Sequence, residues 1–253
     1  TEEQLMLRDS VRGFAERYLA QGALTRAHQE SFPRDVAKLL AEQGLMGITV
    51  PENAGGIGGS LMDAVIAIET VASICPRSAD VVQSGNFGAI RTFGEYATKD
   101  QQKRFLEPLL KGEKIITVSM SEPEAGSAVT DLITSATPDG EGFRINGSKA
   151  FGSHSPEADL FLVYVRFGSG VNGIGSVLVE RGMEGFTQGH PVRYLGGEQW
   201  AQLYFEDVYI GAENVILGEG GFKKQIAGFN VERIGNSARS LALGQLAFDI
   251  ARD

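Results

Sequence analysis

The sequence predicts an α+β protein in which helices come first, a β-rich unit follows, and a helix returns at the end. Apolar residues recur at helical spacing up to about Lys114, and short β-branched runs separated by Gly, Pro and Asp replace them afterwards. Helical spacing returns after Gly220-Gly221. Helices segregated from strands indicate α+β rather than alternating βαβ architecture. We place the units at residues 1–114, 115–221 and 222–253.

The first unit begins with a helix over Glu2–Leu19, where Thr1 is the expected N-cap and early acidic residues favour the helix start. A second helix is expected after Phe32-Pro33, because proline is favoured in the first helical turn. Further helices are predicted over Leu61–Ser73, Ala79–Phe93 and Lys99–Leu110.

The middle unit is expected to contain antiparallel strands joined by short turns. Pro138-Asp139-Gly140 predicts one such turn, because Pro presets one dihedral angle and Gly supplies a positive φ. The predicted strands are Ile115–Met120, Ile133–Thr137, Gly142–Ile145, Asp159–Phe167, Gly173–Glu180 and Gln202–Val208. The final helical pattern reaches Ile250 without a Gly or Pro stop, so we expect the chain to end within a helix.

Composition excludes several functional classes. The 253 residues are 42% hydrophobic and 22% charged, which is typical of globular proteins, and the net charge of −9 argues against nucleic acid or anionic membranes as partners. No run of roughly 18 apolar residues predicts a membrane span, and the start does not resemble a signal peptide. We therefore expect a cytoplasmic protein, with the mitochondrial matrix as the alternative. Cys75 is alone and three His are dispersed, so no metal site is predicted.

The stretch from Ile115 to His154 carries the strongest functional pattern. A β-rich run ends in Ser-Glu-Pro at 121–123 and leads into the small-residue loop Glu124-Ala125-Gly126-Ser127. A second segment, Asn146-Gly147-Ser148-Lys149, is followed by the aromatic Phe151 and the hydroxyl of Ser153. Backbone amides, hydroxyls and an aromatic face together favour a flat polar ring system that carries phosphates.

These two segments resemble the acyl-CoA dehydrogenase signature, and the resemblance extends over essentially the whole chain. Phe32-Pro33 and Val50-Pro51-Glu52 match the N-terminal domain of that family, while Phe205-Glu206-Asp207-Val208 matches the end of its middle domain. The resemblance implies an N-terminal helical domain, a β-barrel-like middle domain and a C-terminal helical bundle. Only the first helix of that bundle is expected here, so we interpret the chain as truncated.

The resemblance implies FAD as cofactor. The residues that match its flavin-binding positions are Val118, Met120, Ser121, Gly126, Ser127, Phe151, Gly152 and Ser153. Hydroxyl and amide donors at these positions would stabilise the charge that the flavin gains on reduction. The pattern also departs from the family: Phe151 replaces the usual Trp, Ser153 the usual Thr, His154 an Asn and Ala128 an Asp. These changes affect the tuning of the flavin.

Substrate residues are implied on the final helix and beside it. Ser127, Asn230 and Arg233 match positions that contact acyl-CoA, and Glu232 matches the catalytic base of a minority of members, which includes the isovaleryl type. Most members carry the base in a later loop, so the alternative is that Glu232 is a helix-surface residue paired with an arginine. Arg91 is a further hypothesis, as a bidentate partner of a substrate carboxylate.

His154 has two interpretations. It is either an acid or charge next to the flavin or, as we favour, a histidine of a surface loop. Cys75 is expected to be a small buried residue of a helix.

The function implied by the resemblance is FAD-dependent α,β-dehydrogenation of an acyl-CoA thioester, with electrons passed to electron-transferring flavoprotein and a homo-oligomer, dimer or tetramer, as the assembly. Two alternatives stay open: a flavoprotein of the same fold with oxidase, monooxygenase or desulfinase chemistry, and a non-catalytic partner subunit.

Overall fold

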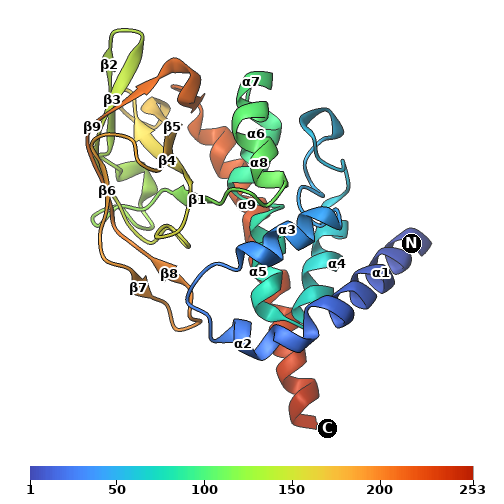
Figure 1. Ribbon diagram of the computed structural model, residues 1–253. Coiled ribbons are helices and arrows are strands. Elements are labelled where there is room, and N and C mark those ends of the chain that lie inside the picture. Colours follow the sequence, from blue (N-terminus) through green and yellow to red (C-terminus); the bar gives the residue numbers. More distant parts are fainter. Residues whose placement is uncertain (253) are drawn as a thin grey trace.

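The computed structural model describes residues 1–252 and contains a helical unit beside a β-sheet unit (Figure 1). The helices before the sheet are α1 Glu2–Tyr18, α2 Ala23–Ala27, α3 Arg34–Glu42, α4 Leu61–Ala72, α5 Pro76–Ser84, α6 Ala89–Tyr96, α7 Lys99–Gln101 and α8 Glu107–Leu110. A π-helical turn at 102–106 joins α7 to α8, so the predicted helix over 99–110 is confirmed as one continuous helical stretch.

Local sequence explains how these helices begin. The side chain of Thr1 accepts from Gln4 N, and the Gln4 side chain reaches back to Thr1 N, which forms a capping box at α1. Ser60 and Asp63 form the same arrangement at α4. Cys75 is buried as expected but lies just before α5, at its N-cap position, rather than within a helix.

The predicted helix over 79–93 was wrong, because the chain breaks it into α5 and α6. Gly88 has φ +59°, a left-handed value that ends helical continuity and that a residue with a side chain adopts only with strain. Asn86 holds the break: its side chain accepts from Ile48 N and donates to Leu45 O and Val82 O. Helical spacing on either side of a glycine pair conceals such a break.

The main sheet contains eight strands, seven of them in the order β10-β5-β4-β2-β3-β9-β6, with β1 beside β4. Its strands are β1 Ile116–Ser119, β2 Ser135–Asp139, β3 Gly142–Lys149, β4 Leu160–Arg166, β5 Ile174–Glu180, β6 Phe186–Gln188, β9 Leu203–Gly211 and β10 Val215–Leu217, and the hairpin β7 Val192–Arg193 with β8 Gln199–Trp200 stands apart. The 138–140 turn is confirmed between β2 and β3.

The sheet is mixed, which corrects the expectation of antiparallel strands throughout. Most neighbours are antiparallel, but β1 runs parallel to β4, with Ile116 opposite Leu160 and Ser119 opposite Val163. The connection between them contains the whole β2–β3 hairpin. That route carries both sequence motifs, at the end of β1 and the end of β3, to the same side of the sheet.

Strand β4 is buried on both faces and joins the two units. Phe161 and Val163 pack into the core shared with β5, β6 and β9, whereas Leu160 and Leu162 pack against α6 and α8. A strand covered on both sides has a continuous apolar sequence, as Leu160–Val165 does. The helical unit is therefore fixed against the sheet through the alternate residues of β4.

The long helix α9, Phe222–Arg252, returns from the sheet and packs along α4 and α5 (Figure 1). Gly235 allows the close approach, because a Cβ there would lie 2.9 Å from the Phe87 ring. Ala238 and Ala242 are buried on the same helix. No helix within residues 1–252 is both long and apolar enough to cross a bilayer.

A buried ion pair ties the two sequence motifs together. Lys149, at the end of β3, is fully buried, and its Nζ lies 2.7 Å from Glu122 Oε1 and 3.0 Å from Met120 O. The Glu122 carboxylate also accepts from Ile133 N and Thr134 N. One carboxylate thus fixes the loop that follows β1, the entry to β2 and the end of β3.

The pKa values of Lys149 and Glu122 are shifted by burial and, in the opposite direction, by the charge of the partner. Burial lowers the pKa of Lys149 to about 8, although the charge of Glu122 opposes this shift. Burial alone would raise the pKa of Glu122, but the charge of Lys149 and the hydrogen bond from Ile133 N outweigh it and lower that pKa. A buried charge is tolerated only when its partner stays in place.

We expect Lys149→Met to destabilise the protein by about 3–5 kcal/mol, because the substitution leaves the Glu122 carboxylate buried without its counter-charge. Chemical denaturation followed by circular dichroism measures the change in the free energy of unfolding.

Lys111→Met is the control, since Lys111 forms an exposed ion pair with Glu107 and such pairs contribute little. Its unfolding midpoint should stay close to that of the natural protein. Equal midpoints for the two variants would show that the buried pair does not hold the motifs together.

Candidate functional site

A cavity of about 270 Å³ lies between the sheet unit and helices α5 and α9. The sheet unit lines it with Ile116, Thr117, Val118, Met120, Ser121, Ala150, Phe151, Ser153, His154 and Glu198. The helical unit lines it with Asp80, Gln83, Ser84, Phe87, Gly88, Ala89, Phe229, Glu232, Asn236 and Arg239. The residues of the first set are mostly those of the two motifs.

Most of the sequence-predicted flavin residues meet in this cavity. Val118, Met120, Ser121, Phe151 and Ser153 line it together. Val118 lies in β1 and Met120 and Ser121 follow it, whereas Phe151 and Ser153 follow β3. The Lys149–Glu122 pair and the hydrogen bond from Ala150 N to Ser121 O connect the two segments.

The remaining predicted flavin positions lie outside the lining. Gly152 stands between Phe151 and Ser153, where a Cβ would come within 3.1 Å of Thr117 Oγ1, so the backbone there passes close to β1. Gly126 and Ser127 are exposed on the loop after β1, and a Cβ on Gly126 would meet nothing within 4 Å. Their predicted contacts remain predictions.

The side chain of Phe151 is exposed and its backbone conformation is unusual. Its side chain is 57% exposed, and its φ of +62° is rare for a residue with a bulky side chain. Trp200 packs on it at 4.6 Å between ring centroids, and the Tyr194 hydroxyl donates to Phe151 O at 3.0 Å. The β7–β8 hairpin therefore supports the aromatic face, a role that the sequence motifs did not reveal.

The residues present fit an isoalloxazine ring. Such a ring needs a flat apolar surface and donors at its polar edge. Phe151, Val118 and Met120 provide apolar surface, while the Ser121 and Ser153 hydroxyls line the same cavity. FAD is thus compatible with the donors and the aromatic face that this chain supplies.

Glu232 enters the cavity from α9. Gln83 Nε2 donates to Glu232 Oε1 at 3.0 Å, and a Cβ on Gly88 would lie 3.1 Å from Glu232 Oε2, so a side chain at position 88 would crowd that oxygen. Burial raises the pKa of Glu232, and the hydrogen bond from Gln83 opposes the rise. The carboxylate is therefore a stronger proton acceptor than a free one.

The other predicted substrate residues are not in the cavity lining. Asn230 and Arg233 are exposed on α9 and bond to each other at 2.6 Å. Arg91 pairs with Glu95 one helical turn away on α6 at 2.9 Å. Any role of these residues in binding needs a part of the ligand outside the cavity, so it stays a prediction.

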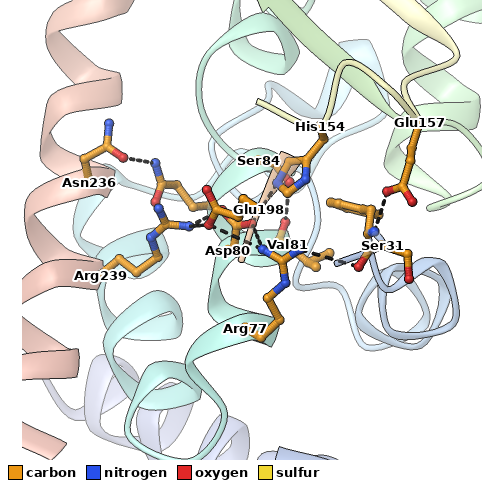
Figure 2. A network of polar contacts seen from close by, with 12 residues as sticks. Ser31, Arg77, Asp80, Val81, Ser84, His154, Glu157, Glu198, Asn236 and Arg239 are labelled. Atoms are coloured by element: carbon orange, nitrogen blue, oxygen red, sulfur yellow. Dashed lines mark hydrogen bonds and ion pairs between the residues drawn. The ribbon is translucent and has the colours of Figure 1, made fainter. Parts of the chain in front are cut away.

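A polar network, which we define as Arg77, Asp80, His154, Glu198 and Arg239, lies at one wall of the site, and all of its members except Arg77 line the cavity (Figure 2). His154 Nε2 lies 2.8 Å from Asp80 Oδ2, and Arg239 Nη1 bonds to Asp80 Oδ1. Arg77 approaches Asp80 at 3.5 Å and Glu198 at 3.4 Å.

The expectation that His154 belongs to a surface loop was wrong. The residue is buried, lies edge-on to Phe32 with 5.0 Å between ring centroids, and lines the cavity. Its φ of +60° turns the chain inward directly after Ser153. The bond to Asp80, which is 74 residues away in the sequence, holds the imidazole there.

The pKa values of the two network acids move apart. Burial would raise the pKa of Asp80, but the hydrogen bond and charge of His154 and the two arginines hold it at about 2. Burial and the charge of Asp80 raise the pKa of Glu198. Asp80 is the fixed anion of the network, and Glu198 is the acid more easily protonated.

Asp80, His154 and Glu198 bring potential metal-ligand atoms within 4.8 Å of one another. Two guanidinium groups, of Arg77 and Arg239, already neutralise these carboxylates. A cation would have to compete with both arginines, so the arrangement is that of a salt-bridge network rather than of a metal site.

Comparison with known proteins places this geometry in a family. The description "Acyl-CoA dehydrogenase, N-terminal domain" matches residues 1–113, and "Acyl-CoA dehydrogenase, middle domain" matches residues 117–208. The short-chain-specific acyl-CoA dehydrogenase of Clostridium acetobutylicum is 32% identical over all of this chain and 68% of its own length. The mitochondrial isobutyryl-CoA dehydrogenase of Dictyostelium discoideum is 36% identical, over all of this chain and 62% of its own.

A solved structure agrees with these sequences. Butyryl-CoA dehydrogenase from Megasphaera elsdenii superposes with a TM-score of 0.87 at 28% identity, covering 98% of this chain and 67% of that protein. The chain thus spans about two thirds of the length of such relatives. It belongs to the acyl-CoA dehydrogenase family, which confirms the predicted fold class and the predicted class of FAD-dependent oxidoreductases.

Proposed function

We propose that this protein catalyses FAD-dependent α,β-dehydrogenation of an acyl-CoA thioester. The observation that carries the proposal is the position of Glu232, which lies in the same cavity as the motif residues Ser121, Phe151 and Ser153. A base beside an aromatic, hydroxyl-bearing surface that can hold a flavin is what the removal of two hydrogens from adjacent carbons requires.

The residues of the chain divide the work. Glu232 takes the proton from C2 of the acyl group, and Gln83 holds the carboxylate in place through its hydrogen bond. Phe151, Ser121 and Ser153 would hold the flavin ring. When bound, FAD supplies the acceptor for the hydride from C3.

The proposal also includes further cofactor and CoA contacts, the electron acceptor, the assembly and the compartment. Ser127, Gly126, Asn230 and Arg233 would contact the parts of the cofactor and of CoA that extend beyond the cavity. Electron-transferring flavoprotein would be the acceptor, and a dimer or tetramer the assembly. The cytoplasm or the mitochondrial matrix would be the compartment.

We expect Glu232→Gln to lower the rate of flavin bleaching by acyl-CoA about 10²–10⁴-fold while acyl-CoA binding is retained, because the amide keeps the size and polarity of the side chain but cannot accept the proton. Stopped-flow absorbance on the FAD-loaded protein measures the rate, and titration measures binding.

Asp249→Asn is the matched control, since Asp249 lies on the same helix but outside the cavity lining. Its bleaching rate should equal that of the natural protein. Bleaching at the natural rate in Glu232→Gln would rule out this base. Rapid reoxidation of the reduced flavin by oxygen would favour the oxidase or monooxygenase alternative, and a protein that never bleaches would favour the non-catalytic subunit.

We expect Gln83→Leu to move the acid limb of the pH–rate profile to higher pH. The reaction needs ionised Glu232, so the rate rises as pH passes through the pKa of that group. Burial places this pKa above its usual value of 4.5, and the hydrogen bond from Gln83 restrains the rise. Loss of the donor therefore raises the pKa further.

Asn236→Ala serves for comparison, because it removes the other partner of Gln83 at 2.7 Å but leaves the bond to Glu232. The profile of kcat/KM against pH should keep its acid limb in this variant. An unchanged acid limb in Gln83→Leu would show that the ionisation of Glu232 does not control the rate.

A further inference from the structure

The helical side of the cavity carries several polar and charged side chains. Asp80, Gln83, Asn236 and Arg239 line it from α5 and α9, and His154 and Glu198 of the sheet unit lie directly against them. Only Phe87, Ala89 and Phe229 offer apolar side chains among the lining residues of α5, α6, α9 and the segment between α5 and α6.

This polar wall is held in place and cannot withdraw from a ligand. Asp80 is bonded to His154 and Arg239 and approached by Arg77, and Arg77 is itself buried. Gln83 is buried and donates to both Glu232 and Asn236. A plain alkyl end that entered here would exclude water from charged groups without replacing any hydrogen bond, which is costly.

The charges of the wall select the kind of group that fits. A carboxylate would face Asp80, Glu198 and Glu232, and an ammonium would face Arg239. A neutral group that both donates and accepts avoids both conflicts. Arg239 is a donor and the His154 ring carries an N–H group, whereas the Glu198 carboxylate and the Asn236 amide oxygen accept. A hydroxyl meets both needs.

We propose that the acyl group of the natural substrate carries a hydroxyl beyond C3, recognised by His154, Arg239 and the acceptors beside them. This inference rests on the proposed function, because it assumes that the acyl chain occupies the cavity. A site built to hydrogen-bond a hydroxyl discriminates strongly against the analogue that lacks it.

The test compares thioesters of equal length in the FAD-loaded natural protein. The pairs are 4-hydroxybutanoyl-CoA with pentanoyl-CoA, and 5-hydroxypentanoyl-CoA with hexanoyl-CoA, so that a hydroxyl replaces a methyl group. We expect at least a tenfold preference for the hydroxylated member of one pair, in kcat/KM and in Kd.

Equal or tighter binding of the methyl-ended member in both pairs would overturn the inference. Oxidation of either compound would at the same time support the proposed function. Binding of both without any flavin bleaching would sink the proposed function, and the ratio of Kd values would still decide the present inference.

Variants of the wall show which residues are responsible. His154→Leu should reduce the preference to less than about threefold, and His154→Asn, which keeps a hydrogen-bonding side chain, should retain part of it. Phe229→Leu is the control: it alters an apolar lining residue and should change both members of a pair alike. Thermal melting checks that each variant is folded. A preference that survives His154→Leu and is unchanged in His154→Asn would exclude His154 from recognition.

Discussion

The architecture of the site depends on the buried ion pair between Lys149 and Glu122. The two motifs that supply the cavity lie at the ends of β1 and β3, and neither is long enough to form a stable surface alone. The Glu122 carboxylate accepts from Lys149 and from two backbone amides, and it connects the motifs beside the backbone hydrogen bond from Ala150 N to Ser121 O. Two residues outside the cavity lining thereby help to position Ser121 and Phe151.

The part of the site that sequence reasoning identified is local in the chain. Ser121, Phe151 and Ser153 fall within one stretch whose order of residue types is distinctive, and Glu232 was found through the same family pattern. The helices with capping boxes were equally visible, because a cap and its partner are three residues apart.

The rest depends on contacts between distant segments. Asp80 lies 74 residues from His154 and 159 from Arg239, and nothing near any of them signals the others. One clue was present: Asp80 interrupts an apolar stretch of α5, and Glu232, Asn236 and Arg239 share a face of α9 at helical spacing. The break at Gly88 was concealed, because helical periodicity continues on both sides of it.

Helix α9 carries both the Glu232 carboxylate and two of the polar residues that line the cavity beside it. Glu232, Asn236 and Arg239 lie on one continuous helix, and Leu241 and Phe248 further along it are exposed. Because these residues share one helix, a displacement of α9 would move Glu232 and the polar residues of the wall together. The packing of α9 against α4 and α5 therefore aligns the carboxylate and the polar side chains at the same time.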